Sequence, residues 1–308
     1  MNKQKSTSRH FYKQAAVSIV GAGSVGTSLA LLLHKSHYPF VSVISRKKTS
    51  AKKLALLVHC MNYSCDVADI HLSTRIVILT VSDSSLAEVA KQIAQRSKLD
   101  FKSLYVCHTS GSLTSDVLKP LQEKGAMVFS MHPIQTFPSI LKNKEQQKRM
   151  RGIWYGIEGN SSTLRFAKML VRSLDGNAVV IPKEEKILYH IGCVLASNYI
   201  VTLLGSVEQL FRNALPVTLK QMQPLIQASI DNTMNVGASR ALTGPIARGD
   251  VELIHEHLSA LKKIDNKILK IYRVLGKQAI DLAIKEKKIS NSVALQLKEL
   301  LRKRKRNK

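Results

Sequence analysis

The sequence predicts an α/β protein in which a doubly wound parallel sheet is followed by an all-α domain. Three observations support this prediction. Short Val- and Ile-rich runs alternate with amphipathic stretches, a glycine-rich turn follows the first run, and helical periodicity dominates beyond residue 182. The chain of 308 residues is long enough for two domains of ordinary size.

Strands are expected at the apolar runs of the first half, and helices at the amphipathic stretches between them. The expected strands are residues 15–20, 40–45, 75–81, 103–108, 126–131 and 177–182. The expected helices are residues 24–36, 50–61, 84–97, 114–124 and 161–174. Near-continuous Val and Ile runs are typical of parallel strands that helices cover on both faces.

The chain is strongly basic, with 47 Lys and Arg against 21 Asp and Glu and a formal net charge of +26. Four of the positive charges lie in residues 1–13 and six in residues 302–308, and neither segment holds an acid. A basic surface suits nucleic acid, but the C-terminal run RKRKRNK has no aromatic residue to stack on bases. We therefore expect no nucleic-acid partner, and we treat residues 1–14 as a basic extension and residues 291–308 as a basic tail.

The cysteines and the N-terminus indicate the compartment. Cys60, Cys65, Cys107 and Cys193 form no CxxC pair, and the histidines near Cys60 and Cys65 do not complete a zinc spacing. We expect free thiols, no metal site and a cytoplasmic protein, because the polar N-terminus lacks the apolar core of a signal peptide. No apolar run reaches the roughly 20 residues of a membrane span, so no membrane partner is expected.

Gly21, Gly23 and Gly26 form a GxGxxG turn between the first expected strand and the next helix, which begins with Ser24 and Val25. This context is typical of a Rossmann-like dinucleotide site. The first glycine allows the tight turn, the second lets the backbone approach a pyrophosphate, and the third allows close helix–strand packing. The alternative is a glycine-rich turn without a ligand.

The end of the second expected strand indicates which nucleotide is preferred. NAD-binding sites of this type have an acid about twenty residues after the last glycine, where this chain has Arg46. Ser45, Arg46 and Lys47 offer a hydroxyl and cations to a ribose 2′-phosphate, so we predict NADP(H) as the cofactor. The alternative is that these cations belong only to the general basic surface.

Polar residues follow three further strands, at the edge of the sheet where a cofactor would lie. In chain order the residues at these strand ends, most of them polar, are Val81, Ser82, Asp83, His108, Ser110, Gly111, His132, Gln135 and Thr136. We expect the residues up to Gly111 to contact the cofactor and the last three to bind substrate. Asp83 is equally suited to cap a helix, and strand-end histidines are often structural.

The motifs GAGSVG, VSDSSL, CHTSGSL and MHPIQTFP resemble a bacterial family of candidate oxidoreductases in which a Rossmann-like domain precedes a helical domain of unknown function. Residues 186–199 and 241–250 resemble its second half. That family is similar to ketopantoate reductase, pyrroline-5-carboxylate reductase, prephenate dehydrogenase and the β-hydroxyacid dehydrogenases. The resemblance implies that residues 15–182 bind NADP. It also implies that residues 183–290 form a substrate and dimerisation domain of the 6-phosphogluconate-dehydrogenase-like type.

The first helix beyond residue 182 carries four polar residues, Lys186, His190, Ser197 and Asn198. Lys186 and His190 are four apart and Ser197 lies two turns further on, so these three share one face of a regular helix. In the related reductases this helix faces the nicotinamide. We expect His190 or Lys186 to supply the proton, and Ser197 and Asn198 to fix the substrate oxygen. His190 is slightly favoured because the ordinary pKa of histidine is near neutral, whereas the related reductases offer a precedent for Lys186. The alternative is a solvated stripe.

Thr243 and Arg248 lie in a turn ahead of a further helix, in which apolar residues recur at helical spacing. We expect both to bind substrate, with Arg248 holding a carboxylate. Asp250 is expected to cap the helix rather than to take part in chemistry.

These expectations predict an NADP(H)-dependent oxidoreductase that transfers a hydride to or from a small 2-oxo or hydroxy acid, in the manner of ketopantoate reductase. The alternatives are reduction of a cyclic imine, dehydrogenation of a β-hydroxyacid, and a non-catalytic NADP sensor. A homodimer through the helical domain is expected, because helical second domains of this type often bury a dimer face.

Overall fold

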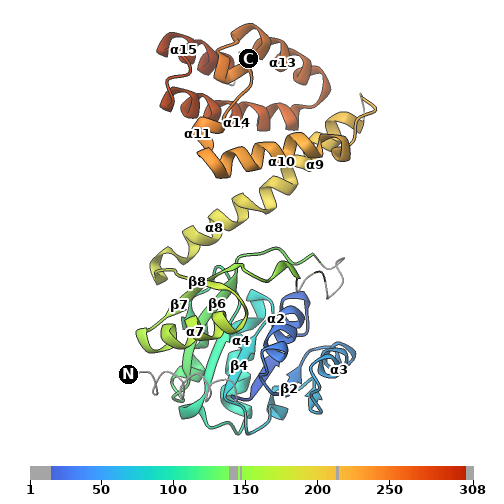
Figure 1. Cartoon of the computed structure of the whole chain (residues 1–308), viewed down its shortest axis with the longest axis vertical. Coiled ribbons are helices and arrows are strands. Elements are labelled where there is room, and N and C mark those ends of the chain that lie inside the picture. The colour runs from blue at the N-terminus through green and yellow to red at the C-terminus, as the bar shows by residue number, and fades with distance from the viewer. Residues whose placement is uncertain (1–14, 139–144, 146–147, 213–214, 303–308) are drawn as a thin grey trace, which may run out of the picture. The chain divides into compact units, whose positions relative to one another are not determined.

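A computed structural model of the chain describes residues 15–138, 145, 148–212 and 215–302 (Figure 1). The basic extension 1–14 and the basic residues 303–308 lie outside the described residues. The chain divides into two compact units, Met1–Ser197 and Asn198–Lys308, which we call unit 1 and unit 2.

Unit 1 is built on an eight-stranded sheet with the order β3-β2-β1-β4-β5-β6-β7-β8 (Figure 1). The strands are β1 (Val17–Val20), β2 (Phe40–Ile44), β3 (Tyr63–Ser64), β4 (Ile76–Leu79), β5 (Tyr105–His108), β6 (Met127–Pro133), β7 (Trp154–Gly159) and β8 (Asn177–Val180). The strand order reverses at β1, which lies between β2 and β4. Open α/β sheets bind their ligands at such a switch point, outside the carboxyl ends of the strands.

The strands from β1 to β6 are parallel to one another, in agreement with the prediction. The far edge of the sheet departs from the predicted parallel arrangement, because β7 pairs antiparallel with β6 and β8 pairs parallel with β7. Apolar patterning does not reveal strand direction, which the connection between β6 and β7 decides. The antiparallel register places Ser130 of β6 opposite Glu158 of β7.

Helices cover both faces of the sheet, which confirms the doubly wound arrangement. On one face, α2 (Ser24–Lys35), α3 (Lys48–Leu57) and α7 (Ser161–Ser173) share an apolar core with the strands. On the other face, α4 (Asp83–Arg96) and the short α5 (Lys119–Gln122) do the same.

Short 3-10 turns replace or precede some of the expected helices. They are η1 (Val67–Asp69), η2 (Phe101–Ser103), η3 (Ser115–Leu118) and η4 (Lys183–Glu185). The expected helix over 114–124 is η3 followed by α5. Pro120 explains the break, because proline lacks the N–H that a continuous helix needs and its ring clashes with the preceding turn.

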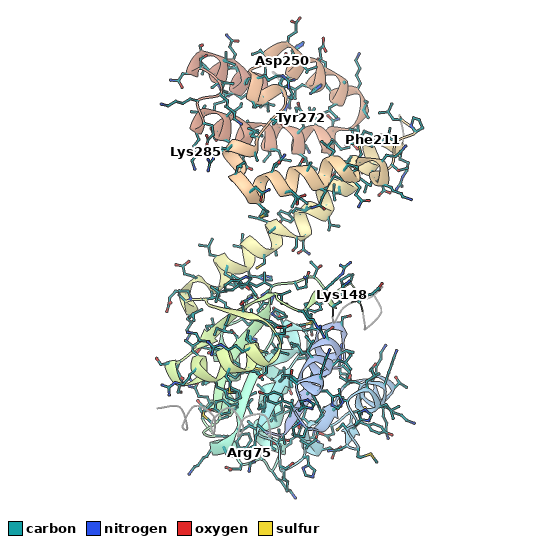
Figure 2. The ribbon with its side chains drawn as sticks, in the orientation of Figure 1. Arg75, Lys148, Phe211, Asp250, Tyr272 and Lys285 are labelled. Carbon is teal, nitrogen blue, oxygen red and sulfur yellow. The ribbon has the colours of Figure 1, made fainter. Side chains whose placement is uncertain are left out.

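Unit 2 is helical, as predicted. Its helices are α9 (Asn198–Arg212), α10 (Leu219–Val236), α11 (Ala238–Ala241), α12 (Pro245–Arg248), α13 (Val251–Ile264), α14 (Asn266–Lys285) and α15 (Asn291–Leu300). The side chain of Asp250 accepts a hydrogen bond from the N–H of Leu253 and caps α13, as predicted. Asp250 is labelled in Figure 2, as is Tyr272. Tyr272 of α14 pairs with His257 of α13, with 2.8 Å between Oη and Nδ1.

The predicted basic tail begins too early. Residues 291–300 form α15, whose Ala294 and Leu297 are buried in the core of unit 2. Apolar residues spaced three apart on an otherwise polar helix are enough to anchor it.

The division between the units falls after Ser197, later than the boundary expected at residue 182. The reason is that α8 (Lys186–Ala196) is bonded to the sheet of unit 1, through Lys186 to Ser130 and through Tyr189 to His132.

One segment within the described residues, residues 183–212, is long and apolar enough to cross a membrane, with a mean hydropathy of 1.7 in its best window; it comprises η4, α8 and α9. No apolar run of that length was expected from the sequence. Length and composition alone are weak grounds for a membrane span. The first part of this segment also carries Lys186, whose ammonium is bonded within unit 1.

Candidate active site

The glycine turn joins β1 to α2 as the sequence predicts, and each glycine meets a different environment. Gly21 has a φ of +112°, and a Cβ there would lie 2.6 Å from Thr80 Oγ1. A Cβ at Gly26 would lie 2.2 Å from the carbonyl oxygen of Gly21. A Cβ at Gly23 would meet no atom within 4 Å. A side chain therefore has no room at Gly21 or Gly26, whereas the space beside Gly23 is open.

The N-terminus of α2 lies at that opening. Gly23 is the N-cap residue and forms no side-chain cap, so the first N–H groups of the helix, beginning at Ser24 and Val25, are not capped by it. Unsatisfied N–H groups and the helix dipole make such a terminus suitable for a phosphate group.

Cations gather where β2 leads into α3. Arg46, Lys47 and Lys48 are exposed and follow Ser45 directly. Lys47 is the N-cap of α3, and the first turn of this helix, all of it within the described residues, holds no acid. A cavity of about 590 Å³ adjoins Lys48 and is lined by β3, the segment after it and α4.

Asp83 fastens the loop after β5 to the start of α4. Its Oδ2 accepts hydrogen bonds from Ser110 Oγ at 2.7 Å and from Ser112 Oγ at 2.8 Å. Ser82, not Asp83, is the N-cap residue of α4. Asp83 therefore positions the loop that holds Ser110 and Gly111. The sequence suggested either a contact with the cofactor or a helix cap, and the structure shows that Asp83 holds this loop to the start of α4.

His108 is fully buried, and both of its ring nitrogens are bonded within the same loop. Nε2 donates to the carbonyl oxygen of Thr114 at 3.1 Å, and Nδ1 accepts from the N–H of Ser110 at 3.2 Å. Burial, and after it the charge of Lys186, lowers the pKa of His108 to about 4. The imidazole is neutral at physiological pH and shapes the loop, leaving no ring nitrogen for a cofactor.

His132 and His190 meet at Gly111. A Cβ on Gly111 would lie 2.6 Å from His190 Nδ1 and 2.9 Å from His132 Nε2. The two imidazole rings are 6.2 Å apart between centroids and nearly perpendicular. His190 Nδ1 is buried and has no hydrogen-bond partner among the described residues. The absence of a side chain at position 111 thus leaves room for two histidines.

Tyr189 of α8 lies beside His132, and together with His190 these residues form one group. Its Oη lies 2.7 Å from His132 Nδ1, and the rings meet edge to face at 5.7 Å. Gly156 of β7 makes room for the phenol, because a Cβ there would lie 2.7 Å from Tyr189 Oη.

Lys186 lies four residues before His190 on α8 and is buried, with only 1% of its surface exposed. Its ammonium donates a hydrogen bond to Ser130 Oγ. The buried carboxylate of Glu158, which pairs with Ser130 across the strands, accepts from the N–H of Ser115 at 2.7 Å and from its Oγ at 2.8 Å.

The buried lysine and its histidine neighbours affect each other's charge. Burial lowers the pKa of Lys186 to about 8, although Glu158 and Asp83 favour its charged form. Burial, followed by the charges of Lys186 and His190, lowers the pKa of His132 to about 4. At neutral pH the group therefore combines one ammonium with the neutral imidazole of His132.

The remaining predicted residues of unit 1 lie outside this group. Ser197 ends α8 with φ −129° and ψ −69°, and its Oγ donates to the carbonyl oxygen of Cys193. Gln135 and Thr136 bond to each other, with 2.8 Å between the N–H of Thr136 and Gln135 Oε1. Gln135 and Thr136 form no hydrogen bond with Lys186 or His190 within the described residues.

Asn198, Thr243 and Arg248 belong to unit 2. Asn198 is exposed at the start of α9, where its carbonyl oxygen accepts a hydrogen bond from Thr202 Oγ1. Thr243 is exposed just ahead of the short α12, and Arg248 is exposed as the last residue of that helix. Their predicted contact with substrate stays a prediction.

Four residues of the group escaped the sequence analysis: Tyr189, Ser130, Ser115 and Glu158. Tyr189 stands beside His190 on α8, so a polar pair at the start of that helix could have drawn attention to it. Glu158 is an acid inside an apolar strand, a pattern that indicates a buried partner.

No cluster of three or more His, Cys, Asp or Glu side chains in the described part of the chain is arranged to hold a metal ion.

The doubly wound sheet, its open glycine turn and the polar group at its carboxyl edge define a Rossmann-like fold joined to a helical unit. Residues 1–133 match the sequence pattern of a Rossmann-like domain. Residues 153–279 match that of a domain of unknown function, DUF2520. The second match begins at β7, so the last two strands, α7 and α8 belong with it. No curated protein matches the sequence.

Solved structures share this fold across almost the whole chain. A candidate NADP oxidoreductase from Bacteroides fragilis is 24% identical, with a TM-score of 0.70, over 87% of this chain and 98% of its own. The protein TM1727 from Thermotoga maritima is 24% identical, with a TM-score of 0.68, over 88% and 99%. A reductive aminase from Aspergillus terreus, in complex with NADPH and ethyl-5-oxohexanoate, is 14% identical, with a TM-score of 0.57, over 94% and 92%. The chain therefore has the fold of NADP oxidoreductases.

Proposed function

We propose that this protein is an NADP(H)-dependent oxidoreductase. The observation that carries the proposal is the glycine turn, where Gly23 leaves open space while a side chain at Gly21 or Gly26 would collide with the backbone or Thr80. A pyrophosphate needs that close approach to the N-terminus of α2. The reductive aminase of similar fold holds NADPH, which supports the same cofactor class.

The preference for NADP(H) over NAD(H) rests on the cations after β2. Arg46 and Lys47 are exposed at the uncapped start of α3, where helix dipole and side-chain charge both favour an anion. The adjoining cavity beside Lys48 offers room for the adenosine end of a nucleotide. A 2′-phosphate is the anion that distinguishes NADP(H) at this end.

The proposed reaction is the reduction of a carbonyl group. NADPH supplies a hydride when bound, and the carbonyl oxygen also needs a proton. His190 is the proposed proton donor, because its Nδ1 has no partner among the described residues. Lys186 is less suited, since its buried ammonium is committed to Ser130. The proton leaves a ring nitrogen of His190 for the oxygen as the hydride reaches the carbon.

The charge of the group favours a 2-oxo acid, such as ketopantoate, as substrate. The Lys186 ammonium stabilises negative charge that develops on a carbonyl oxygen. An iminium ion would instead call for a free carboxylate, but Asp83 and Glu158 are both bonded to serines. Arg248 is the proposed partner of the substrate carboxylate. Reduction of a cyclic imine and oxidation of a β-hydroxyacid are the second candidates.

A screen of NADPH oxidation with 2-oxo acids, cyclic imines and, in reverse, β-hydroxyacids tests the proposal. A pantothenate auxotroph tests the ketopantoate activity in cells. His190→Ala should lower kcat by about 10²-fold or more and leave NADPH affinity unchanged, since one proton donor is lost. His255→Ala, an exposed histidine of α13, is the matched control.

The outcomes of this screen separate the alternatives. Tight NADPH binding without turnover of any substrate would favour a sensor. Full activity of His190→Ala would remove His190 from the reaction.

The same chain is proposed to form a homodimer through α8 and the start of α9. This stretch exposes a set of large apolar side chains, namely Ile187, Leu188, Ile191, Leu195, Tyr199, Ile200 and Val201. Large exposed apolar side chains in such number mark an interaction site, and a second copy offers the same side chains in return.

A further inference from the structure

Tyr189 and His132 form a direct contact that the proposed reaction does not yet use. The 2.7 Å separation between Tyr189 Oη and His132 Nδ1 is that of a strong hydrogen bond. The phenol is held in place by the bare backbone of Gly156 on one side and by the imidazole on the other. The contact joins α8 to the end of β6.

The direction of this hydrogen bond follows from the chemistry of its two groups. The pKa of His132 is lowered to about 4, so the imidazole is neutral and has one donor and one acceptor nitrogen. Burial, followed by the charge of the Cys193 thiol and a hydrogen bond between the two side chains, raises the pKa of Tyr189, so the phenol keeps its hydrogen. A phenol is the better donor and an imidazole nitrogen the better acceptor. Tyr189 therefore donates to Nδ1, and the single hydrogen of the imidazole resides on Nε2.

That hydrogen is placed beside the proposed proton donor. Nε2 of His132 and Nδ1 of His190 both lie within 3 Å of the position that a Cβ on Gly111 would take. No hydrogen bond to His132 Nε2 is formed within the described residues. The Nε2–H group is thus available to a ligand, and its position depends on the partner of Nδ1.

We propose that Tyr189 is a positioning residue that holds His132 in the Nε2–H tautomer, so that His132 donates a neutral hydrogen bond to the carbonyl oxygen of the substrate. This inference rests on the proposed reduction. The hydrogen bond stabilises the negative charge that forms on the oxygen, and His132 does not give up its proton. The proton that completes the alcohol comes from His190, so the two histidines have separate tasks.

A nitrogen NMR measurement on histidine-labelled protein tests the tautomer without requiring turnover. In the unaltered protein, His132 should show a protonated Nε2 and an unprotonated Nδ1 whose resonance is displaced by its hydrogen bond. Tyr189→Phe should move the Nδ1 resonance toward that of an unbonded imidazole nitrogen. Tyr155→Phe is the matched control, because the buried Tyr155 hydroxyl has no partner among the described residues. It should leave His132 unchanged.

Kinetics give the second measurement. Tyr189→Phe should lower kcat about tenfold, the equivalent of one hydrogen bond, with the KM for NADPH unchanged. His132→Gln keeps an N–H donor near the Nε2 position and should retain more activity than His132→Ala. Circular dichroism of each variant confirms that it folds.

Three results would overturn the inference. The first is an Nδ1–H tautomer in the unaltered protein. The second is a Tyr189→Phe variant with unchanged His132 resonances and unchanged kcat. The third is a loss of activity in Tyr189→Phe far beyond tenfold with unchanged His132 resonances, which would place Tyr189 on the substrate itself. If no substrate is turned over but the resonances behave as described, the proposed function fails while the positioning role stands.

Discussion

Replacing Lys186 by methionine should change the stability of the protein by an amount that depends on pH. Burial lowers the pKa of Lys186 from 10.5 to about 8. Each unit of such a shift corresponds to about 1.4 kcal/mol, so the burial of the ammonium costs up to roughly 3 kcal/mol where the lysine is charged in both states. Methionine has a similar length and carries no charge, so Lys186→Met removes this cost.

The sign follows from proton binding. Between pH 8 and pH 10.5 the unfolded chain holds a proton on Lys186 that the folded chain has released, so raising the pH favours the folded state. Above pH 10.5 Lys186 is neutral in both states, so its burial carries no charge penalty. As the pH falls from 10.5 to 8 that penalty appears, and the folded state loses the corresponding stability. The free energy of unfolding of the unaltered protein, minus that of Lys186→Met, should therefore rise by up to roughly 3 kcal/mol between pH 7.5 and pH 10.5. Ser130 loses its partner in the variant, which adds a constant cost of about 1–3 kcal/mol at both pH values.

Urea unfolding at the two pH values measures this difference. Subtracting the variant cancels the other titrating groups, provided that they are unaffected by the substitution. Lys91→Met on the exposed face of α4 is the control, because its ammonium is in water in both the folded and the unfolded chain. A difference that is the same at pH 7.5 and pH 10.5 would refute the description of Lys186 as a buried cation.

Three further predictions concern the cofactor and the second subunit. Gly23→Ala should leave the melting temperature unchanged but weaken NADPH binding at least tenfold in a fluorescence titration, whereas Gly26→Ala should lower the melting temperature because its Cβ would lie 2.2 Å from a carbonyl oxygen. Equal effects of the two substitutions on stability would contradict this. Arg46→Glu should weaken NADPH binding by about tenfold or more and leave NADH binding nearly unchanged, and Arg165→Glu on α7 serves as the charge-matched control. Leu195→Glu should convert a dimer into a monomer in sedimentation experiments, and a monomeric unaltered protein would exclude the dimer outright.

Local patterns made much of unit 1 predictable. The glycine turn, the strands before it and after it, and the residues at the strand ends are set by short stretches of sequence, and the structure contains them where the patterns indicate. His132 and Gly111 are neighbours because parallel strands end at the same edge of a sheet. This relation holds for any chain that repeats the strand–helix unit.

Which residues form the buried group depends on contacts between distant parts of the chain, and short sequence patterns do not predict such contacts. Glu158 lies on β7, and only the antiparallel pairing with β6 brings it opposite Ser130. Lys186 was predicted to share a polar face of its helix with His190 and Ser197, with a solvated stripe as the alternative, and in the structure it is buried against the sheet. The stripe itself assumed one regular helix through Ser197, where the backbone departs from helical angles and α8 ends.

Gly111 shows that a missing side chain can be as specific as a present one. Its backbone conformation is open to other residues, and only the space beside it is restricted, since a nitrogen of each imidazole lies within 3 Å of the position that a Cβ would take. One added methyl group would push the two rings apart without changing any charge or any hydrogen-bonding atom. Alanine at this position would therefore displace both rings, although it differs from glycine by a single methyl group.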